Sequence, residues 1–385
     1  MSPTPVTYTS PTAPASYSWE ATNEEVAARY GIPVEQIVRF DLNTSPAPPD
    51  LATTLLASGR FETPLSEYPP SDYRRLIEAA AARYGVATEE LLVGAGADEI
   101  LDLVGKAFLP AGGAAVIPTP TYAMYRVLTE QRGARVVAVP RRDAVAGWAI
   151  DAEGIRAAVR ETAASVVWLC SPNNPTALPE PDGAIAALLE GLQADAAAET
   201  PPGEPPIVVL DEAYAEFVGT SLVGLRTRYP RLVVVRTASK AYALAGLRVG
   251  FAIAAPEVVA AVSPYRPPGS VSTVSVTIVT EALRDPTILD ANLERVEAER
   301  ERLRSGLREA GWSVGPSVTN FVLADLGTPE RAAAVAEGLL RHGLVPRTFP
   351  GGHPLAAYLR LTVRDAREDD RLLDAVRTIE AEAAP

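Results

Sequence analysis

Short apolar runs alternate with helical patterns through the middle of the chain. Most runs are continuous and rich in β-branched residues, which is typical of strands in a sheet covered on both faces. Because helical periodicity lies between many of them, the order predicts an α/β fold with a mostly parallel sheet. The runs are Ala114–Ile117, Arg135–Val139, Ser165–Leu169, Ile207–Leu210, Leu232–Val235 and Gly250–Ala254.

The pattern changes near Asp285, where a long charged helix is predicted over Leu289–Ala310. The mixture of short strands and helices in this part of the chain indicates a smaller α+β domain over residues 285–385, after a large domain over residues 41–284. We expect the N-terminal segment, residues 1–40, to join the small domain. The small domain is predicted to contain strand-like runs and helices at Ser317–Ala324, Pro329–His342, Leu344–Arg347, Tyr358–Val363 and Glu368–Ala383.

The start of the chain has a different character. Its first 18 residues are rich in Ser, Thr and Pro and are expected to be mobile. A helix is predicted over Asn23–Tyr30, with Thr22 or Asn23 as its cap, and another over Asp72–Tyr84. The proline-rich stretch Asp41–Tyr68 shows little periodicity and is predicted to be an irregular surface segment.

Composition and charge exclude several classes of protein. The 385 residues suffice for two domains with full cores, and the net charge of −13 argues against a nucleic-acid or anionic-membrane partner. No apolar run approaches the roughly 20 residues of a spanning helix. The single cysteine, Cys170, cannot form a disulfide within the chain, which fits a reducing compartment. The N-terminus shows no signal-peptide pattern, so the two observations together favour the cytoplasm. Two histidines argue against a multi-histidine metal site, and no metal is predicted.

Lysine is scarce in this chain. Of 35 basic residues only Lys106 and Lys240 are lysines, and a lysine retained among so many arginines suggests a need for an amine that can lose its proton. Lys106 lies on an amphipathic helical pattern and fits a solvated face. Lys240 follows the run Leu232–Val235 among small hydroxyl residues, so it is the better candidate for a reactive amine.

Polar loops follow several predicted strands, where ligands of open α/β sheets bind. The glycines of Gly94–Glu99 suit a phosphate at a helix start, or merely a plain helix start. Tyr122 offers a ring for stacking, or fills the core. Asn174 presents an amide, or only closes a turn. Asp211 ends an apolar strand and needs a cation, which a ring nitrogen, an arginine or a helix N-terminus would provide.

These side chains together match the needs of pyridoxal phosphate. A lysine amine binds the cofactor's aldehyde carbon, and an acidic residue pairs with the pyridinium nitrogen. From Asp41 to the C-terminus the chain resembles the fold-type I pyridoxal-phosphate aminotransferases, and within them the histidinol-phosphate aminotransferases. The resemblance rests on eight motifs in register: YPPSDYRRL, VGAGADEILDL, PTPTYAMY, SPNNPT, DEAY, TASKAYALAGLRVG, TNFVLAD and LRLTV.

The resemblance implies a role for each matching residue. Lys240 binds the cofactor covalently and transfers protons, Asp211 holds the ring nitrogen, and Tyr214 and Asn174 bind the phenolic oxygen. Tyr122 stacks on the ring. The residues implied for the phosphate are Gly96, Ala97, Asp98, Thr237, Ser239 and Arg248, with Tyr68 from the second subunit of a homodimer. Those implied for the substrate are Arg360 at the α-carboxylate, assisted by Asn320, and Arg347 at the substrate phosphate.

The implied reaction is the transamination that pairs histidinol phosphate with 2-oxoglutarate, which becomes glutamate, in histidine biosynthesis. The chain departs from the family pattern at three places: Thr44-Ser45 replaces Glu-Asn, Ala177 replaces the glycine of Asn-Pro-Thr-Gly, and Gly269-Ser270 replaces an aromatic-Asn pair. The first and third lie in segments that usually border the substrate of this family. The alternatives are an aromatic or broad-range aminotransferase, a phosphothreonine decarboxylase of the same fold, and a non-catalytic cofactor-bearing sensor. A decarboxylase would release CO2 without an oxo-acid acceptor.

Overall fold

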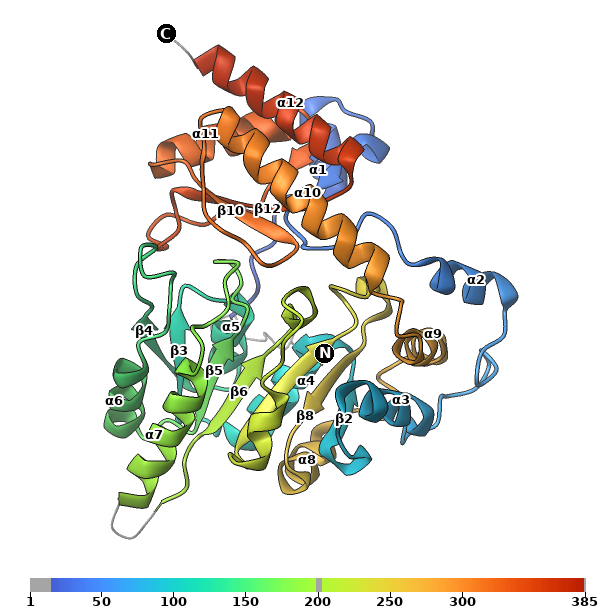
Figure 1. The fold of residues 1–385 in the computed structure, drawn as a ribbon, viewed down its shortest axis with the longest axis vertical. Helices are drawn as coiled ribbons and strands as arrows, with labels where there is room; N and C mark the ends of the chain where they lie inside the picture. The colour runs from blue at the N-terminus through green and yellow to red at the C-terminus, as the bar shows by residue number, and fades with distance from the viewer. Residues whose placement is uncertain (1–14, 199–202, 384–385) are drawn as a thin grey trace, which may run out of the picture.

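A seven-stranded sheet forms the centre of the large domain in the computed structural model, which describes residues 15–198 and 203–383 (Figure 1). The strand order is β2-β8-β7-β6-β5-β3-β4; β8 is antiparallel to both neighbours, and the other pairs are parallel. The mostly parallel sheet is as predicted. The strands are β2 (Leu91–Gly94), β3 (Ala114–Thr119), β4 (Arg135–Pro140), β5 (Val166–Cys170), β6 (Ile207–Asp211), β7 (Leu232–Thr237) and β8 (Gly250–Ile253).

Helices cover both faces of this sheet, which explains why its strands are apolar throughout. Along β5 successive side chains enter opposite cores: Trp168 packs with one set of helices and Leu169 with the other. The first set is α4 (Gly96–Phe108), α5 (Ala123–Gln131) and α8 (Pro256–Val262). The second set is α3 (Arg74–Tyr84), α6 (Ala152–Thr162), α7 (Ala184–Ala198) and α9 (Thr273–Arg284).

The small domain is built on a three-stranded antiparallel sheet, in the order β12-β10-β9. Its strands are β9 (Ser313–Val314), β10 (Phe321–Asp325) and β12 (Tyr358–Thr362). The helices that pack with it are α10 (Asp290–Glu309), α11 (Pro329–Arg341) and α12 (Ala366–Ala383). Helix α10 is 20 residues long and reaches from this domain toward the large one (Figure 1).

The N-terminal segment lies against the small domain. Helix α1 (Asn23–Tyr30) has the predicted bounds and is capped by Thr22, whose side chain accepts from the Glu25 backbone N–H. Arg29 and Tyr30 of α1 both donate hydrogen bonds to Glu337 on α11. The short strand β1 (Val38–Arg39) pairs in parallel with β11 (Leu344–Val345). Most of the stretch expected to be mobile, residues 1–14, lies outside the described residues.

The sequence pattern misses one helix and several short strands. Helix α2 (Asp50–Ser58) lies inside the stretch predicted to be irregular; it packs on α9, and its C-cap Gly59 is left-handed, with φ +62°. The prolines that obscured it precede its first turn, where proline costs no helical hydrogen bond. Strands β1, β2 and β9 have two, four and two residues, which are too few to show a periodicity. No helix among the described residues is apolar over the length of a bilayer crossing.

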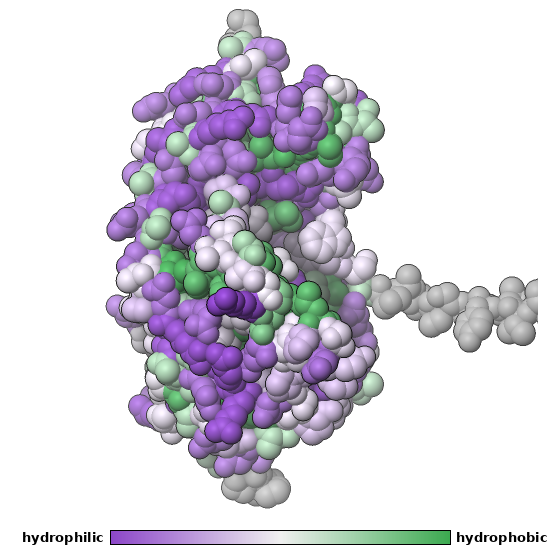
Figure 2. Space-filling view, turned by 90° about the vertical axis from the view of Figure 1, so that its right-hand side faces the viewer, coloured by the Kyte–Doolittle hydropathy of each residue, from purple (hydrophilic) through white to green (hydrophobic). Residues whose placement is uncertain are grey.

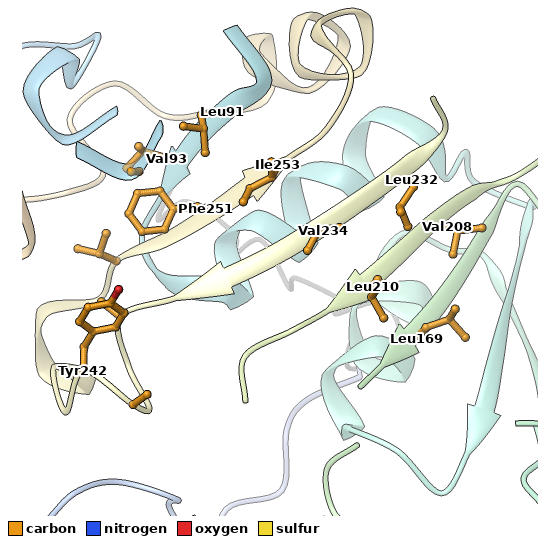
Figure 3. Packing of buried hydrophobic residues seen from close by; sticks show 14 of the residues in the cluster. Leu91, Val93, Leu169, Val208, Leu210, Leu232, Val234, Tyr242, Phe251 and Ile253 are labelled. Atoms are coloured by element: carbon orange, nitrogen blue, oxygen red, sulfur yellow. The ribbon is translucent and has the colours of Figure 1, made fainter. Parts of the chain in front are cut away.

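Phe251 lies in the core between the sheet and its covering helices (Figure 3). Its ring is fully buried and meets the Tyr84 ring edge-on at a centroid distance of 5.8 Å. Phe251→Ala should lower the free energy of unfolding by about 3–5 kcal/mol, because it removes buried contacts and leaves a cavity. Denaturant titration measures this. Val145→Ala, at a 98% exposed position, should change it by under about 0.5 kcal/mol. A loss below about 1 kcal/mol at Phe251 would contradict this packing.

Candidate active site

A cavity of about 620 Å³ lies beyond the carboxyl ends of the parallel strands. Cys170, Asp211 and Thr237 are the last residues of β5, β6 and β7, and all three line it, as does Arg360 from β12. Strand direction in a parallel sheet thus brings together side chains that are far apart in sequence. Eleven of the predicted site residues line this cavity: Ala97, Asp98, Tyr122, Asn174, Asp211, Tyr214, Thr237, Ser239, Lys240, Arg248 and Arg360.

Asp211 carries a buried carboxylate at the end of an entirely buried strand. Its Oδ2 accepts from the Tyr125 hydroxyl at 2.8 Å and its Oδ1 from the Ala213 backbone N–H at 3.0 Å. Burial raises the pKa of this carboxyl to about 6, although both hydrogen bonds lower it. A cation placed beside Asp211 would offset the cost of this buried charge, as the pyridinium nitrogen of the predicted cofactor would.

Lys240 presents its amine in the loop after β7. The Nζ donates to the Leu42 carbonyl at 3.2 Å and lies 5.9 Å from the centroid of the Tyr214 ring. Burial, followed by the charge of Arg360, lowers the pKa of this amine to about 8. About a tenth of the amine is therefore neutral and nucleophilic at pH 7, against well under a thousandth for an ordinary lysine. Lys106 instead pairs with Asp102 at 2.6 Å on α4.

The start of α4 forms a cradle for an anion. No side chain caps this helix, and its first residue, Gly96, has φ +85°. A Cβ on Gly250 would lie 2.4 Å from the Gly96 carbonyl carbon, so only glycine allows β8 to approach so closely. A Cβ on Gly96 would lie 2.6 Å from Nη2 of Arg248, which places this guanidinium beside the uncapped helix start. Backbone N–H groups and a guanidinium together suit a phosphate.

Hydroxyl groups lie next to this cradle and fix its shape. The Thr237 hydroxyl lies 2.9 Å from the Ser239 hydroxyl and accepts from the Ser239 backbone N–H at 3.2 Å. Asp98 accepts from the Tyr122 hydroxyl at 3.0 Å and lies 3.4 Å from Arg248. Five of the predicted phosphate residues therefore line one cavity, and Gly96 lies beside Arg248: the five are Ala97, Asp98, Thr237, Ser239 and Arg248.

Arg360 carries a guanidinium that is buried without an acidic partner. Its Nη1 donates to Oδ1 of Asn174 at 2.6 Å and its Nη2 to the Asp41 carbonyl. No carboxylate of the described residues pairs with it, and its Nε, also buried, has no hydrogen-bond partner there. A buried positive charge held only by neutral dipoles is costly, so the site strongly favours an incoming carboxylate.

Three predicted residues outside the phosphate cradle do not line the cavity. Tyr68 is 90% exposed. Arg347 is joined to Arg360 by a backbone bridge, and its guanidinium contacts the N-terminal segment. Asn320 donates to the Asn43 carbonyl at 2.9 Å rather than to a group on Arg360. Their predicted roles stay predictions.

Sequence reasoning missed several residues of the site. Asn43 has φ +53° and donates to the Tyr214 hydroxyl at 2.9 Å. Tyr125 holds Asp211 from the same motif as Tyr122, one helical turn later, and that spacing was the available signal. Tyr17 and Trp19 also line the cavity. Within the described residues, no group of three or more His, Cys, Asp or Glu side chains is placed to hold a metal.

The chain is similar to known aminotransferases over most of its length. The family model described as aminotransferase class I and II matches residues 61–376. Histidinol-phosphate aminotransferase of Roseiflexus castenholzii is 36% identical over 365 residues, covering 92% of this chain and 93% of its own. The Thermococcus gammatolerans protein of the same name is 35% identical, covering 89% and 92%. A crystal structure of the Sinorhizobium meliloti histidinol-phosphate aminotransferase with pyridoxal-5'-phosphate has a TM-score of 0.85 at 26% identity, covering 95% and 96%.

Lys240 gives a prediction about pH. Its lowered pKa implies that the cofactor-free protein captures pyridoxal phosphate faster as pH rises, by about tenfold per unit below pH 7, levelling off above about pH 8. Borohydride reduction at timed intervals, followed by peptide mapping, measures the rate and the site. Lys240→Arg should give no label, since a guanidinium cannot form the bond. A rate still rising tenfold per unit at pH 10, or label on Lys106, would contradict the assignment.

Proposed function

The chain belongs to the class I and II aminotransferase family, whose cofactor is pyridoxal phosphate, and we propose that it transfers an amino group between histidinol phosphate and 2-oxoglutarate. The substrate is proposed from the relatives' names and from two arginines, Arg347 and Arg360. The pathway, histidine biosynthesis, follows from that substrate. The cytoplasm is part of the same proposal, favoured by a single, buried cysteine.

We assign a different part of the cofactor to each group of residues in and beside the cavity. When bound, pyridoxal phosphate withdraws electrons from the carbon that carries the amino group. Asp211 would pair with the ring nitrogen. Lys240 would hold the aldehyde carbon in the resting protein, and its amine, once displaced by the substrate amine, would move the proton. Tyr122 would stack on the ring, while Tyr214 and Asn174 would bind its phenolic oxygen. The residues that would hold the phosphate are Gly96, Ala97, Asp98, Thr237, Ser239 and Arg248.

The main observation behind the substrate proposal is the guanidinium of Arg360, which is buried and has no carboxylate partner among the described residues. It binds the α-carboxylate of glutamate through two parallel hydrogen bonds, for which the planar guanidinium is suited. Arg347 and Arg360 exchange backbone hydrogen bonds of 3.0 and 3.1 Å, which puts a second guanidinium on the adjoining segment. We assign Arg347 to the phosphate of histidinol phosphate, which has no carboxylate, and Asn320 to supporting Arg360.

An aromatic amino acid aminotransferase is the second candidate. The rings of Tyr17, Trp19 and Tyr122 all line the cavity, and Tyr17 lies 6.3 Å from Tyr122. Such rings suit an imidazole and a phenyl side chain equally well. The departures Thr44-Ser45 and Gly269-Ser270 concern the substrate side, so a comparison of donors decides between the two candidates.

We propose that two chains form a homodimer with shared active sites. Large apolar side chains are exposed at Leu56, Leu65, Tyr68 and Tyr265. Figure 2 shows apolar and weakly polar residues gathered at mid-height on the face turned toward the viewer. Exposed apolar patches of this kind mark association surfaces. In the dimer, Tyr68 reaches the cofactor phosphate of the partner's site.

Separate half-reactions test the substrate. Arg360→Ala should slow the glutamate half-reaction most, and Arg347→Ala the histidinol phosphate half-reaction, each by roughly 30-fold or more, because each loses a charge-assisted pair worth about 2–5 kcal/mol. Single-turnover rates with each donor measure this. Arg377→Ala, on the exposed face of α12, is the matched control and should change neither rate. If the wild-type protein does not turn over histidinol phosphate but does turn over phenylalanine, the aromatic amino acid aminotransferase replaces the histidinol-phosphate aminotransferase as the proposed function.

Mixed dimers test the shared site. Tyr68→Ala and Lys240→Ala chains should each be weakly active or inactive alone, and their heterodimer should regain up to about one intact site of two. The measurement is activity after mixing, unfolding and refolding, with each variant treated alone as the control. Full activity in a species that light scattering shows to be monomeric would contradict the dimer.

A further inference from the structure

The N-terminal segment holds the guanidinium of Arg347. The Nη1 of Arg347 donates to the Ser18 carbonyl at 2.7 Å, and its guanidinium carbon lies 5.1 Å from the centroid of the Tyr17 ring. Oε1 of Glu20 lies 3.7 Å from the same Nη1. The two side chains of this ion pair are only 13% and 17% exposed. A carboxylate of the chain itself thus faces the arginine assigned to the substrate phosphate.

Thr348 fixes the position of Glu20. The same Oε1 accepts from the Thr348 backbone N–H at 2.7 Å and from its hydroxyl at 2.9 Å. These two bonds need an oxygen acceptor but no charge, so a glutamine would retain them. The negative charge of Glu20 and its anchoring of the segment are therefore separable by one substitution.

We propose that Glu20 is a specificity-determining residue, whose carboxylate offsets the charge of Arg347 and weakens phosphate at that position. A substrate phosphate must share Arg347 with a fixed carboxylate and approach that carboxylate closely. Glu20 attracts Arg347 and repels a phosphate bound beside it. Because these side chains are mostly buried, salt screens both interactions little, and they change the affinity for phosphate measurably. Placing a like charge against one class of ligand is a common route to discrimination. This inference rests on the proposed function only in taking Arg347 as the phosphate contact.

Binding of inorganic phosphate to the holoenzyme tests this proposal, because the cofactor then fills the cradle at the start of α4. Glu20→Gln should tighten phosphate binding about five- to tenfold, measured by isothermal titration calorimetry. Glu24→Gln is the matched control: it removes the same charge four residues later, from an exposed position in the first turn of α1. It should leave the affinity unchanged.

A second pair of proteins separates charge from structure. In an Arg347→Ala background, Glu20→Gln should no longer tighten phosphate binding, because the charge it offsets is gone. Unchanged or weaker binding in Glu20→Gln alone, or tightening that persists without Arg347, would overturn the proposal. If phosphate binding tightens as expected while the wild type fails to turn over histidinol phosphate, the proposed substrate fails and the role of Glu20 stands.

Discussion

The buried guanidinium of Arg360 is the constraint on which the arrangement of the site depends. From strand β12 of the small domain, this guanidinium donates to the side-chain amide oxygen of Asn174, in the loop after β5, and to the backbone carbonyl of Asp41, in the segment before α2. A charge in that position needs every neutral dipole within reach, and still its Nε has no partner among the described residues. Both domains therefore meet around one positive charge, and the free energy still to be gained there comes with an anionic ligand.

Burial also makes the charged forms of two other side chains of the cavity, Asp211 and Lys240, costly. Burial pushes the pKa of Asp211 up and that of Lys240 down, so each moves toward its neutral form. A neutral amine is what a nucleophile requires, and a carboxylate that is costly to bury alone favours a cationic partner. These two side chains are thus destabilised until a ligand with complementary charges arrives, and such shifts in pKa are typical of functional sites.

The sequence predicts the sheet and most of the site, for a physical reason. Runs such as Leu232–Val235 are apolar because both faces are covered, and each ends in a polar loop because ligands bind at that edge. Asn43 was missed because its role depends on a left-handed backbone and on Tyr214, 171 residues away. Tyr17 was missed because the composition of the N-terminus indicates mobility. Its ring contacts Arg347 and Tyr122, which are distant in sequence, so no local pattern reveals these contacts.

The segment that bears Tyr17 is attached to both domains. The Ala15 carbonyl accepts from Gln131 on α5 at 2.7 Å, in the large domain, and the Ser18 carbonyl accepts from Arg347 in the small domain. Three residues of fully extended chain span at most about 10 Å. While both bonds hold, this segment is a tether, and it sets an upper limit on how far the two domains separate beside the cavity. Wider opening requires one of the two attachments to break first.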